Sequence, residues 1–235
     1  MADAVRASKP TITPKMRVMS FSFGCGKARD DCSGSPGTAS QFVRRFAGLR
    51  DTSGSVMSQD GLRRAAHVLR SAEALLIGAG AGMGVDSGLP DFRGSEGFWR
   101  AYPAYAKLGL DFAGMANPQW FQRDPALAWG FYGHRLGLYR ATQPHPGFAL
   151  LRSWAERMPR GAFVFTSNVD GQFQKAGFSE DRILEVHGSI HSVQCLGRCG
   201  ELASASPFTV DVDPESFRAR PPLPSCPVCG ALLRP

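Results

Sequence analysis

The chain passes from an apolar run into a glycine-rich segment at residues 74–94, ALLIGAGAGMGVDSGLPDFRG. A continuous apolar run of this length is typical of a strand buried on both faces of a parallel sheet. Glycines directly after such a strand let the backbone approach a phosphate group closely, because no Cβ is in the way. The segment therefore predicts a strand, a tight loop and a helix. A strict G-x-G-x-x-G is absent, so the loop taken alone fits a nucleotide site and an ordinary turn equally well.

Further apolar patterns extend this unit along the chain. Apolar runs at 162–165 and 183–186 predict two more buried strands. Apolar residues at helical spacing predict one helix that starts near Ser58, two helices within 117–142, and one over 147–158. Strands that alternate with helices predict an α/β fold with a doubly wound parallel sheet.

The charge of the chain is concentrated near its start. The chain has 235 residues and a net charge of +7, but its first 50 residues hold nine Lys/Arg and three Asp/Glu. The other residues carry 18 basic and 17 acidic side chains, which disfavours a nucleic-acid surface on the folded part. The sequence contains no apolar run long enough for a membrane span and no secretory signal, so a membrane partner is not expected.

Residues 1–57 mix Ser, Gly, Pro, Lys and Arg without sustained apolar periodicity, which predicts a disordered basic leader. Its first 29 residues contain six Lys/Arg and one acid, Asp3, as some mitochondrial presequences do. Gly and Pro interrupt any amphipathic helix there, so a cytoplasmic location is predicted and a mitochondrial one is the alternative. Cys25 and Cys32 lie in this leader and receive no role.

Four cysteines form two closely spaced pairs separated by 26 residues, namely Cys195, Cys199, Cys226 and Cys229. Such pairs predict a tetrahedral zinc site in which each pair lies on its own turn. Four thiolates leave no open coordination position, so the ion is predicted to be structural. Disulfides are the alternative, which the absence of a secretory signal disfavours. Residues 200–225, rich in Pro and Ser, are predicted to be an inserted loop.

The fifteen residues 80–94 closely resemble the sirtuin signature, which opens with G-A-G and ends in P-D-F-R. The similarity to sirtuins extends over about residues 60–235. It implies an NAD-consuming enzyme with a Rossmann-like large domain and a small zinc-bearing module. Residues 58–190 are then expected to form an incomplete NAD-binding domain, and residues 191–235 a zinc module that is cut short.

The resemblance implies roles for the signature residues. The NAD diphosphate would be lined by Gly80, Ala81 and Gly82. The loop over the nicotinamide ribose would contain Asp91, Phe92 and Arg93. An aromatic ring at this place can shield a reactive sugar from water, and a guanidinium can bind phosphate or the neighbouring carboxylate.

Two shorter motifs follow predicted strands, whose carboxyl ends bind ligands in open α/β sheets. Residues 166–170, TSNVD, resemble the sirtuin T-Q-N-I-D, with Ser167 in place of the longer glutamine. The resemblance implies that Asn168 contacts the ribose region and that Asp170 holds the nicotinamide carboxamide. It also implies that His187 is the catalytic base, so Asn168 and His187 are the predicted catalytic residues. The ordinary histidine pKa of about 6.5 suits this task.

The reaction implied by the resemblance transfers an acyl group from lysine to ADP-ribose and releases nicotinamide. NAD, Zn²⁺ and an acyl-lysine protein or peptide are therefore the expected cofactors and partner. Tyr102 and Tyr105 follow the signature loop, and residue 105 is not the arginine of the Tyr-x-x-Arg pattern found in deacylases that favour acidic acyl groups. Simple acetyl-lysine is therefore the predicted substrate.

The resemblance ends at Pro235, where sirtuins continue with a substrate-binding strand, further ribose and adenine contacts and the last strands of the sheet. The unfinished sheet is expected to expose an unpaired edge. Three interpretations stay open: part of an active deacylase, an NAD-binding chain without turnover, and a zinc-module interaction protein. Two arginines and four acids between Cys199 and Cys226 disfavour a nucleic-acid-binding zinc ribbon. The oligomeric state is not predicted.

Overall fold

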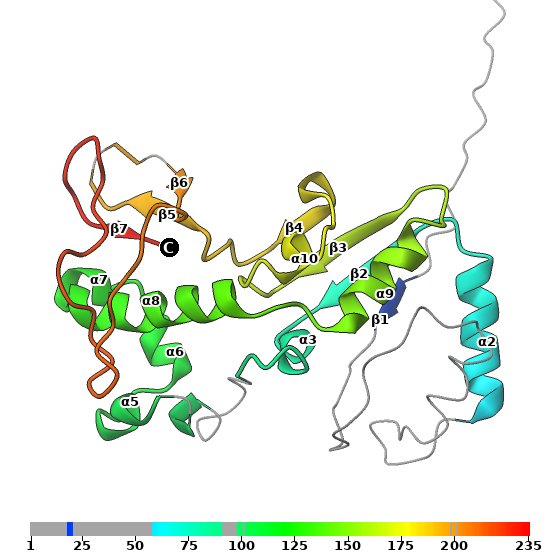
Figure 1. Cartoon of the computed structure of the whole chain (residues 1–235), viewed down its shortest axis with the longest axis horizontal. Coiled ribbons are helices and arrows are strands. Elements are labelled where there is room, and N and C mark those ends of the chain that lie inside the picture. Colours follow the sequence, from blue (N-terminus) through cyan, green and yellow to red (C-terminus); the bar gives the residue numbers. More distant parts are fainter. Residues whose placement is uncertain (1–17, 21–57, 91–97, 101, 198, 201) are drawn as a thin grey trace, which may run out of the picture.

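The computed structural model of the chain describes residues 18–20, 58–90, 98–100, 102–197, 199–200 and 202–235. Figure 1 shows a parallel sheet in one part of the molecule and a small antiparallel sheet in another, with helix α8 (Pro125–Ala141) running between them. Within the described ranges, none of the helices combines the length and the apolar character that a membrane crossing requires.

The larger sheet has four parallel strands in the order β1-β2-β3-β4. They are β1 (Val18–Ser20), β2 (Leu75–Ala79), β3 (Ala162–Thr166) and β4 (Ile183–Glu185). The three predicted apolar runs therefore form neighbouring parallel strands, and their bounds agree with the sequence to within two residues. The predicted α/β fold with a parallel sheet is confirmed.

Strand β1 lies within the leader that the sequence predicts to be disordered, and here the structure differs from that prediction. Its backbone pairs with β2, with Val18 opposite Leu76 and Ser20 opposite Gly78. An edge strand needs backbone partners on one side only, so a segment without apolar periodicity can still join a sheet. The other residues of the leader up to residue 57 lie outside the described ranges.

The predicted helical segments contain α2 (Gln59–Arg70), α7 (Trp120–Arg123) followed by α8, and α9 (Pro146–Ala155). Capping side chains determine where α2 and α8 begin. The Ser58 hydroxyl accepts a hydrogen bond from the Gly61 amide at 3.1 Å, and Oδ1 of Asp124 accepts one from the Leu127 amide at 3.1 Å. The remaining helices are short: α3 (Gly82–Val85), α5 (Pro103–Lys107), α6 (Phe112–Met115), α10 (Gln172–Lys175) and the 3₁₀ turn η1 (Glu180–Arg182).

Helix α9 covers one face of the parallel sheet. Its residues Phe148 and Leu151 pack in one buried cluster with Leu75, Ile77 and Val164 of the strands. Side chains alternate between the two faces of a strand, so the other face carries the intervening residues. Exposed apolar side chains on the strands are Phe163 (37%), Phe165 (48%) and Leu184 (46%). In the part of the chain that the structure describes, this second face of the sheet is therefore only partly covered.

The smaller sheet is antiparallel and packs on helix α8. It consists of β5 (Ser192–Cys195), β6 (Leu202–Ser204) and β7 (Leu233–Arg234) in the order β6-β5-β7. The indole nitrogen of the buried Trp129 in α8 donates a hydrogen bond to the Leu233 carbonyl at 2.9 Å. This bond ties the end of the described chain to the long helix.

Residues 200–225, predicted to be an inserted loop, also pack on α8. The Ala219 amide donates to the Ala126 carbonyl at 2.8 Å. At Gly130 a Cβ atom would lie 1.9 Å from the Phe217 carbonyl oxygen, so only glycine allows this close approach. Phe217 itself has a left-handed backbone with φ of 51°. The inserted segment is therefore part of the folded core.

Candidate active site

Hydrogen bonds tie together the loops that follow β2, β3 and β4. The Thr166 hydroxyl accepts a hydrogen bond from the Asn168 amide at 3.0 Å, and Nδ2 of Asn168 donates to the Gly80 carbonyl at 3.0 Å. From the third loop, Nδ1 of His187 lies 3.2 Å from the Ser167 carbonyl oxygen. Because the strands are parallel and adjacent, their carboxyl ends deliver all three loops to one edge of the sheet.

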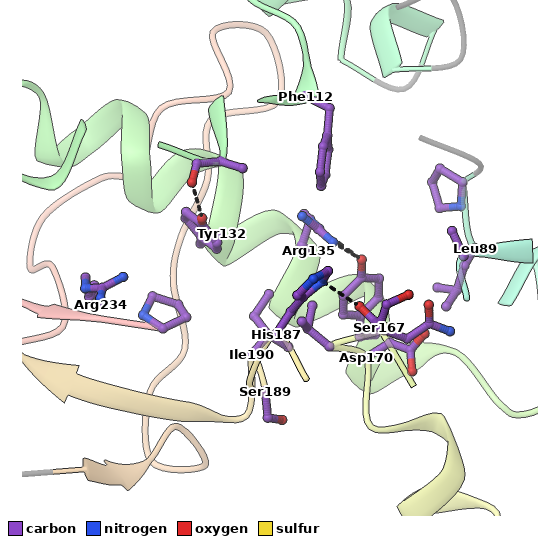
Figure 2. A pocket seen from close by; sticks show the side chains of 17 residues that line it. Leu89, Phe112, Tyr132, Arg135, Ser167, Asp170, His187, Ser189, Ile190 and Arg234 are labelled. Atoms are coloured by element: carbon purple, nitrogen blue, oxygen red, sulfur yellow. Dashed lines mark hydrogen bonds between the residues drawn. The ribbon is translucent and has the colours of Figure 1, made fainter. Parts of the chain in front are cut away.

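A cavity of about 540 Å³ lies at this edge (Figure 2). Such a volume is within the range of small-molecule sites in proteins. The residues predicted from the sequence that line the cavity are Ala81, Asn168, Asp170 and His187. Three loops, represented by Ala81, Asn168 and His187, therefore share one wall although the first lies 87 residues before the second in the chain.

The other predicted cofactor residues are placed differently. Gly80 and Gly82 flank Ala81 without lining the cavity, and Gly80 contributes its carbonyl to the bond with Asn168. The remaining three, Asp91, Phe92 and Arg93, lie outside the described residues.

The exposed ring of His187 adopts a definite protonation pattern when it is neutral. Its Nδ1 faces the Ser167 carbonyl, and a carbonyl oxygen can only accept a hydrogen bond. Nδ1 therefore carries the proton, and Nε2 is left as the proton acceptor. This arrangement suits a general base.

Asp170 is a buried carboxyl group in the cavity wall, 8% exposed. Its Oδ1 accepts a hydrogen bond from the Gln172 amide at 3.0 Å. Burial raises the pKa of Asp170, and the Gln172 amide, His191 and Arg135 oppose this shift. The backbone next to it is also fixed, because Nε2 of His191 lies 2.9 Å from the Asp170 carbonyl oxygen.

Helix α8 supplies a cavity wall that the sequence interpretation missed. Tyr132, Arg135 and Tyr139 line the cavity from this helix, as Figure 2 shows for the first two. Nε of Arg135 donates to the Tyr139 hydroxyl at 2.9 Å, and the guanidinium lies over the Phe131 ring at 5.1 Å from its centroid. Arg135 is 6% exposed, so a strong positive charge is held in a largely desolvated wall.

The sequence contains a pattern from which this cavity wall could have been predicted. Tyr132 and Arg135 form a Tyr-x-x-Arg pattern, and residues three apart on a helix lie on the same face. Burial raises the pKa of Tyr132, and the positive charges of Arg135 and Arg234 oppose the shift. Arg234 of β7 lines the same cavity.

The pair used to predict an acetyl substrate lies elsewhere. Tyr102 and Tyr105 are fully buried in an aromatic cluster and do not line the cavity. The Tyr105 hydroxyl donates to the Phe217 carbonyl at 2.8 Å, and the Tyr102 hydroxyl lies 3.1 Å from Nδ1 of His134. Burial raises the pKa of both tyrosines and lowers the pKa of His134. These residues therefore have a packing role and carry no information on the acyl group.

The four cysteines predicted to bind zinc come together. Their Sγ atoms all lie within 4.8 Å of one another, with Cys195–Cys229 and Cys199–Cys226 at 3.4 Å. A disulfide bond measures about 2.05 Å, and a tetrahedral zinc site with Zn–S bonds of 2.3 Å places its sulfurs roughly 3.8 Å apart. The distances therefore fit zinc and exclude the disulfide alternative for these cysteines.

The backbone around the thiols also suits a metal. The Cys229 and Val228 amides lower the pKa of Cys226 to about 7, which favours the thiolate that binds zinc, whereas the neighbouring thiols raise the pKa of Cys199. At Gly197 a Cβ would lie 3.0 Å from Sγ of Cys229, so glycine makes room for the cluster. The residues present can hold a structural Zn²⁺ ion.

A parallel sheet with a cavity at its carboxyl edge, joined to a cluster of four cysteines that can hold a metal ion, defines the class of α/β proteins that bind ligands at the carboxyl ends of their strands. A model of the Sir2 family matches residues 80–235. The chain belongs to the Sir2 family, the sirtuins.

Curated relatives and solved structures agree with this assignment. The chain is 33% identical to the NAD-dependent protein deacylase of Pyrococcus furiosus, over 72% of this chain and 61% of the relative. It is 35% identical to the mitochondrial NAD-dependent protein deacylase sirtuin-5 of Canis lupus familiaris, over 70% and 54%. A Sir2 homolog–NAD complex matches with a TM-score of 0.57 and 30% identity, over 74% of this chain and 59% of that one. The chain thus spans about three fifths of the length of these relatives.

Proposed function

We propose that this chain carries the catalytic cavity of an NAD-dependent protein-lysine deacylase, which transfers the acyl group of an acyl-lysine to ADP-ribose and releases nicotinamide. The observation that carries the proposal is the shared cavity lined by Ala81, Asn168, Asp170 and His187. The deacylase names of the relatives and a solved Sir2 homolog–NAD complex support it. The predicted cytoplasmic location remains part of the proposal.

Each of the cavity residues has a task that its surroundings support. NAD, when bound, supplies a ribose carbon that the acyl oxygen attacks as nicotinamide leaves. Nε2 of His187 accepts a proton from a ribose hydroxyl, because its Nδ1 is already committed to Ser167. Asn168 is held by Gly80 and orients the ribose, and Asp170 receives the carboxamide in a site with little water. The four cysteines would hold Zn²⁺ with no open coordination position, so the ion would join the two cysteine turns and leave the reaction to the cavity residues.

The α8 residues that line the cavity favour a substrate with an acidic acyl group, and not the acetyl group predicted from the sequence. A guanidinium binds a carboxylate through two parallel hydrogen bonds, and Arg135 presents such a group to the cavity. Tyr132 adds a hydroxyl one helical turn away. We therefore propose that the chain removes dicarboxylic acyl groups such as succinyl from lysine.

Nicotinamide release from NAD and an acyl-lysine peptide tests the reaction. His187→Ala is expected to abolish release, because the proton acceptor is lost. His67→Ala, which changes an exposed histidine on α2, is the matched control and is expected to retain activity. Equal rates for the parent chain and His187→Ala would contradict the proposed role. Binding of NAD without any release would favour an NAD-binding chain without turnover.

Paired acetyl- and succinyl-lysine peptides test the acyl preference. Arg135→Met keeps the apolar packing of the side chain and removes its charge. It is expected to lower kcat/KM for the succinyl peptide by roughly 10- to 100-fold, the value of a charged hydrogen bond, and to leave the acetyl peptide nearly unaffected. An equal loss for both peptides would show that Arg135 only supports the fold. The Tyr132→Phe variant is expected to lower kcat/KM for the succinyl peptide by a smaller factor.

A further inference from the structure

His145, the residue before α9, connects this helix to the segment that follows the glycine loop. Its backbone amide donates a hydrogen bond to Oγ of Ser87 at 3.0 Å. Its ring Nε2 lies 3.1 Å from the Met83 carbonyl oxygen. Met83 belongs to α3, which begins at Gly82, and Ser87 follows that helix.

Both ring nitrogens of His145 are used, and in opposite roles. Nδ1 accepts a hydrogen bond from the Gly147 amide at 3.0 Å and thereby caps α9. An amide can only donate and a carbonyl can only accept, so Nδ1 is unprotonated and Nε2–H donates to Met83. The ring is therefore held as one neutral tautomer. Gly147 leaves room for it, since a Cβ there would lie 2.4 Å from Cε1 of His145.

The two ends of this connection differ in how firmly they are held. Helix α9 is anchored in the core by Phe148, 1% exposed, and by Leu151, 7% exposed. Helix α3 has only four residues, and one of them, Met83, packs partly buried against the same core cluster. Among the described residues, both hydrogen bonds that reach residues 83–87 from another element come from His145. The anchored helix therefore positions the short one.

We infer that His145 is a positioning residue for the NAD-binding glycine loop, residues 80–82. Its Nε2–H and its backbone amide hold residues 83–87 against α9, so that the backbone of the loop is fixed before NAD arrives. A loop that is ordered beforehand loses less entropy on binding, which lowers the dissociation constant. The inference rests on the proposed function only in that the loop binds NAD. The inference does not depend on which acyl group the substrate carries.

Two substitutions of His145 separate its role as the N-cap of α9 from its hydrogen bond to Met83. Asparagine is among the preferred N-cap residues, so His145→Asn keeps an acceptor for the Gly147 amide but is too short to reach Met83. His145→Ala loses both contacts. Ser87→Ala removes the acceptor of the backbone amide from the other side. His67→Ala on α2 is the control, a histidine in an exposed position.

Calorimetry of NAD binding without peptide, together with melting temperatures, tests the inference on the full chain. His145→Asn is expected to weaken NAD binding by roughly three- to tenfold, the effect of one hydrogen bond, while its melting temperature stays close to that of the parent chain. Ser87→Ala is expected to act in the same direction. In the deacylation assay, KM for NAD should rise for His145→Asn, with little change in kcat or in KM for the peptide.

An unchanged NAD affinity in both His145→Asn and Ser87→Ala would overturn the inference. If His145→Asn has the same melting temperature as His145→Ala, asparagine does not replace histidine as the cap of α9. The NAD affinity of Ser87→Ala then decides whether the inference holds. If the parent chain binds no NAD, the proposed function fails, and hydrogen exchange decides the inference separately. Faster exchange of the amides of residues 83–88 in His145→Asn would support it, and equal exchange would refute it.

Discussion

At the residue scale, Asp170 shows how the cavity uses a group in an unfavourable environment. Its carboxyl is buried and accepts a hydrogen bond from the Gln172 amide. Burial disfavours the charged form and raises the pKa. Such a carboxyl is poorly solvated and ready to accept a donor from a ligand.

We expect Asp170→Asn to stabilise the fold at neutral pH and to abolish deacylation. The folded state holds the Asp170 proton to a higher pH than the unfolded state does, so the parent chain loses stability as pH rises from about 4 through the raised pKa. The Asp170→Asn variant has no carboxyl proton to release at this position, so it does not lose stability in this pH range. The gain in the free energy of unfolding should therefore grow with pH and then level off, by about 1.4 kcal/mol for each unit of pKa shift.

Urea unfolding at several pH values between 4 and 8 measures this gain. Asp86→Asn serves as the control, because Asp86 is exposed. A gain that does not vary with pH would mean that Asp170 is not a buried titrating group.

At the scale of elements, α8 joins the two sheets. One face of the helix places Tyr132 and Arg135 in the cavity wall. Other faces hold the zinc module through Trp129 and the inserted segment through Gly130. The position of the α8 wall of the cavity therefore depends on packing at a distance from the cavity.

We expect Gly130→Ala to destabilise the protein by roughly 1–3 kcal/mol, because the added methyl collides with the Phe217 backbone and not with a flexible side chain. Gly137→Ala on the same helix is the matched control. A Cβ there meets nothing within 4 Å, so this change is expected to stabilise by up to about 1 kcal/mol. Thermal unfolding of the two variants measures the contrast. Equal stabilities would show that the inserted segment does not press on α8.

At the scale of the whole molecule, the metal cluster is continuous with a hydrophobic core. Cys195 and Cys226 belong to the same buried cluster as Trp129, Leu136 and Leu233. Four thiolates that approach one another without an ion would repel. Zinc is therefore expected to hold this core together, in addition to the turns that bind it.

Removal of zinc with a chelator is expected to lower the melting temperature and to abolish nicotinamide release, because the α8 wall of the cavity loses its support. Elemental analysis should find one zinc per chain, and Cys226→Ser should lose it. The double variant Cys25→Ser, Cys32→Ser changes the two cysteines outside the cluster and should keep both zinc and stability. Full stability of the metal-free protein would contradict a structural role.

Much of the cavity could be predicted from the sequence, because its ligand-facing residues sit directly after strands. Once 74–77, 162–165 and 183–186 are recognised as parallel strands, their carboxyl ends must carry Ala81, Asn168 and His187 to one edge of the sheet. The zinc site follows equally from spacing, since two short-spaced cysteine pairs can close on one ion wherever the intervening segment goes.

Other features depended on contacts between residues that are distant in the chain. Spacing along a helix places Tyr132 and Arg135 on one face, but only packing decides that this face meets the cavity and that Tyr102 and Tyr105 are buried elsewhere. The open face of the sheet could not be foreseen either, because apolar runs do not reveal which faces will be covered. The sequence by itself determined the order of the elements and the residues that follow the carboxyl ends of the strands. The tertiary structure decided which faces meet, because burial is a property of two surfaces and not of one segment.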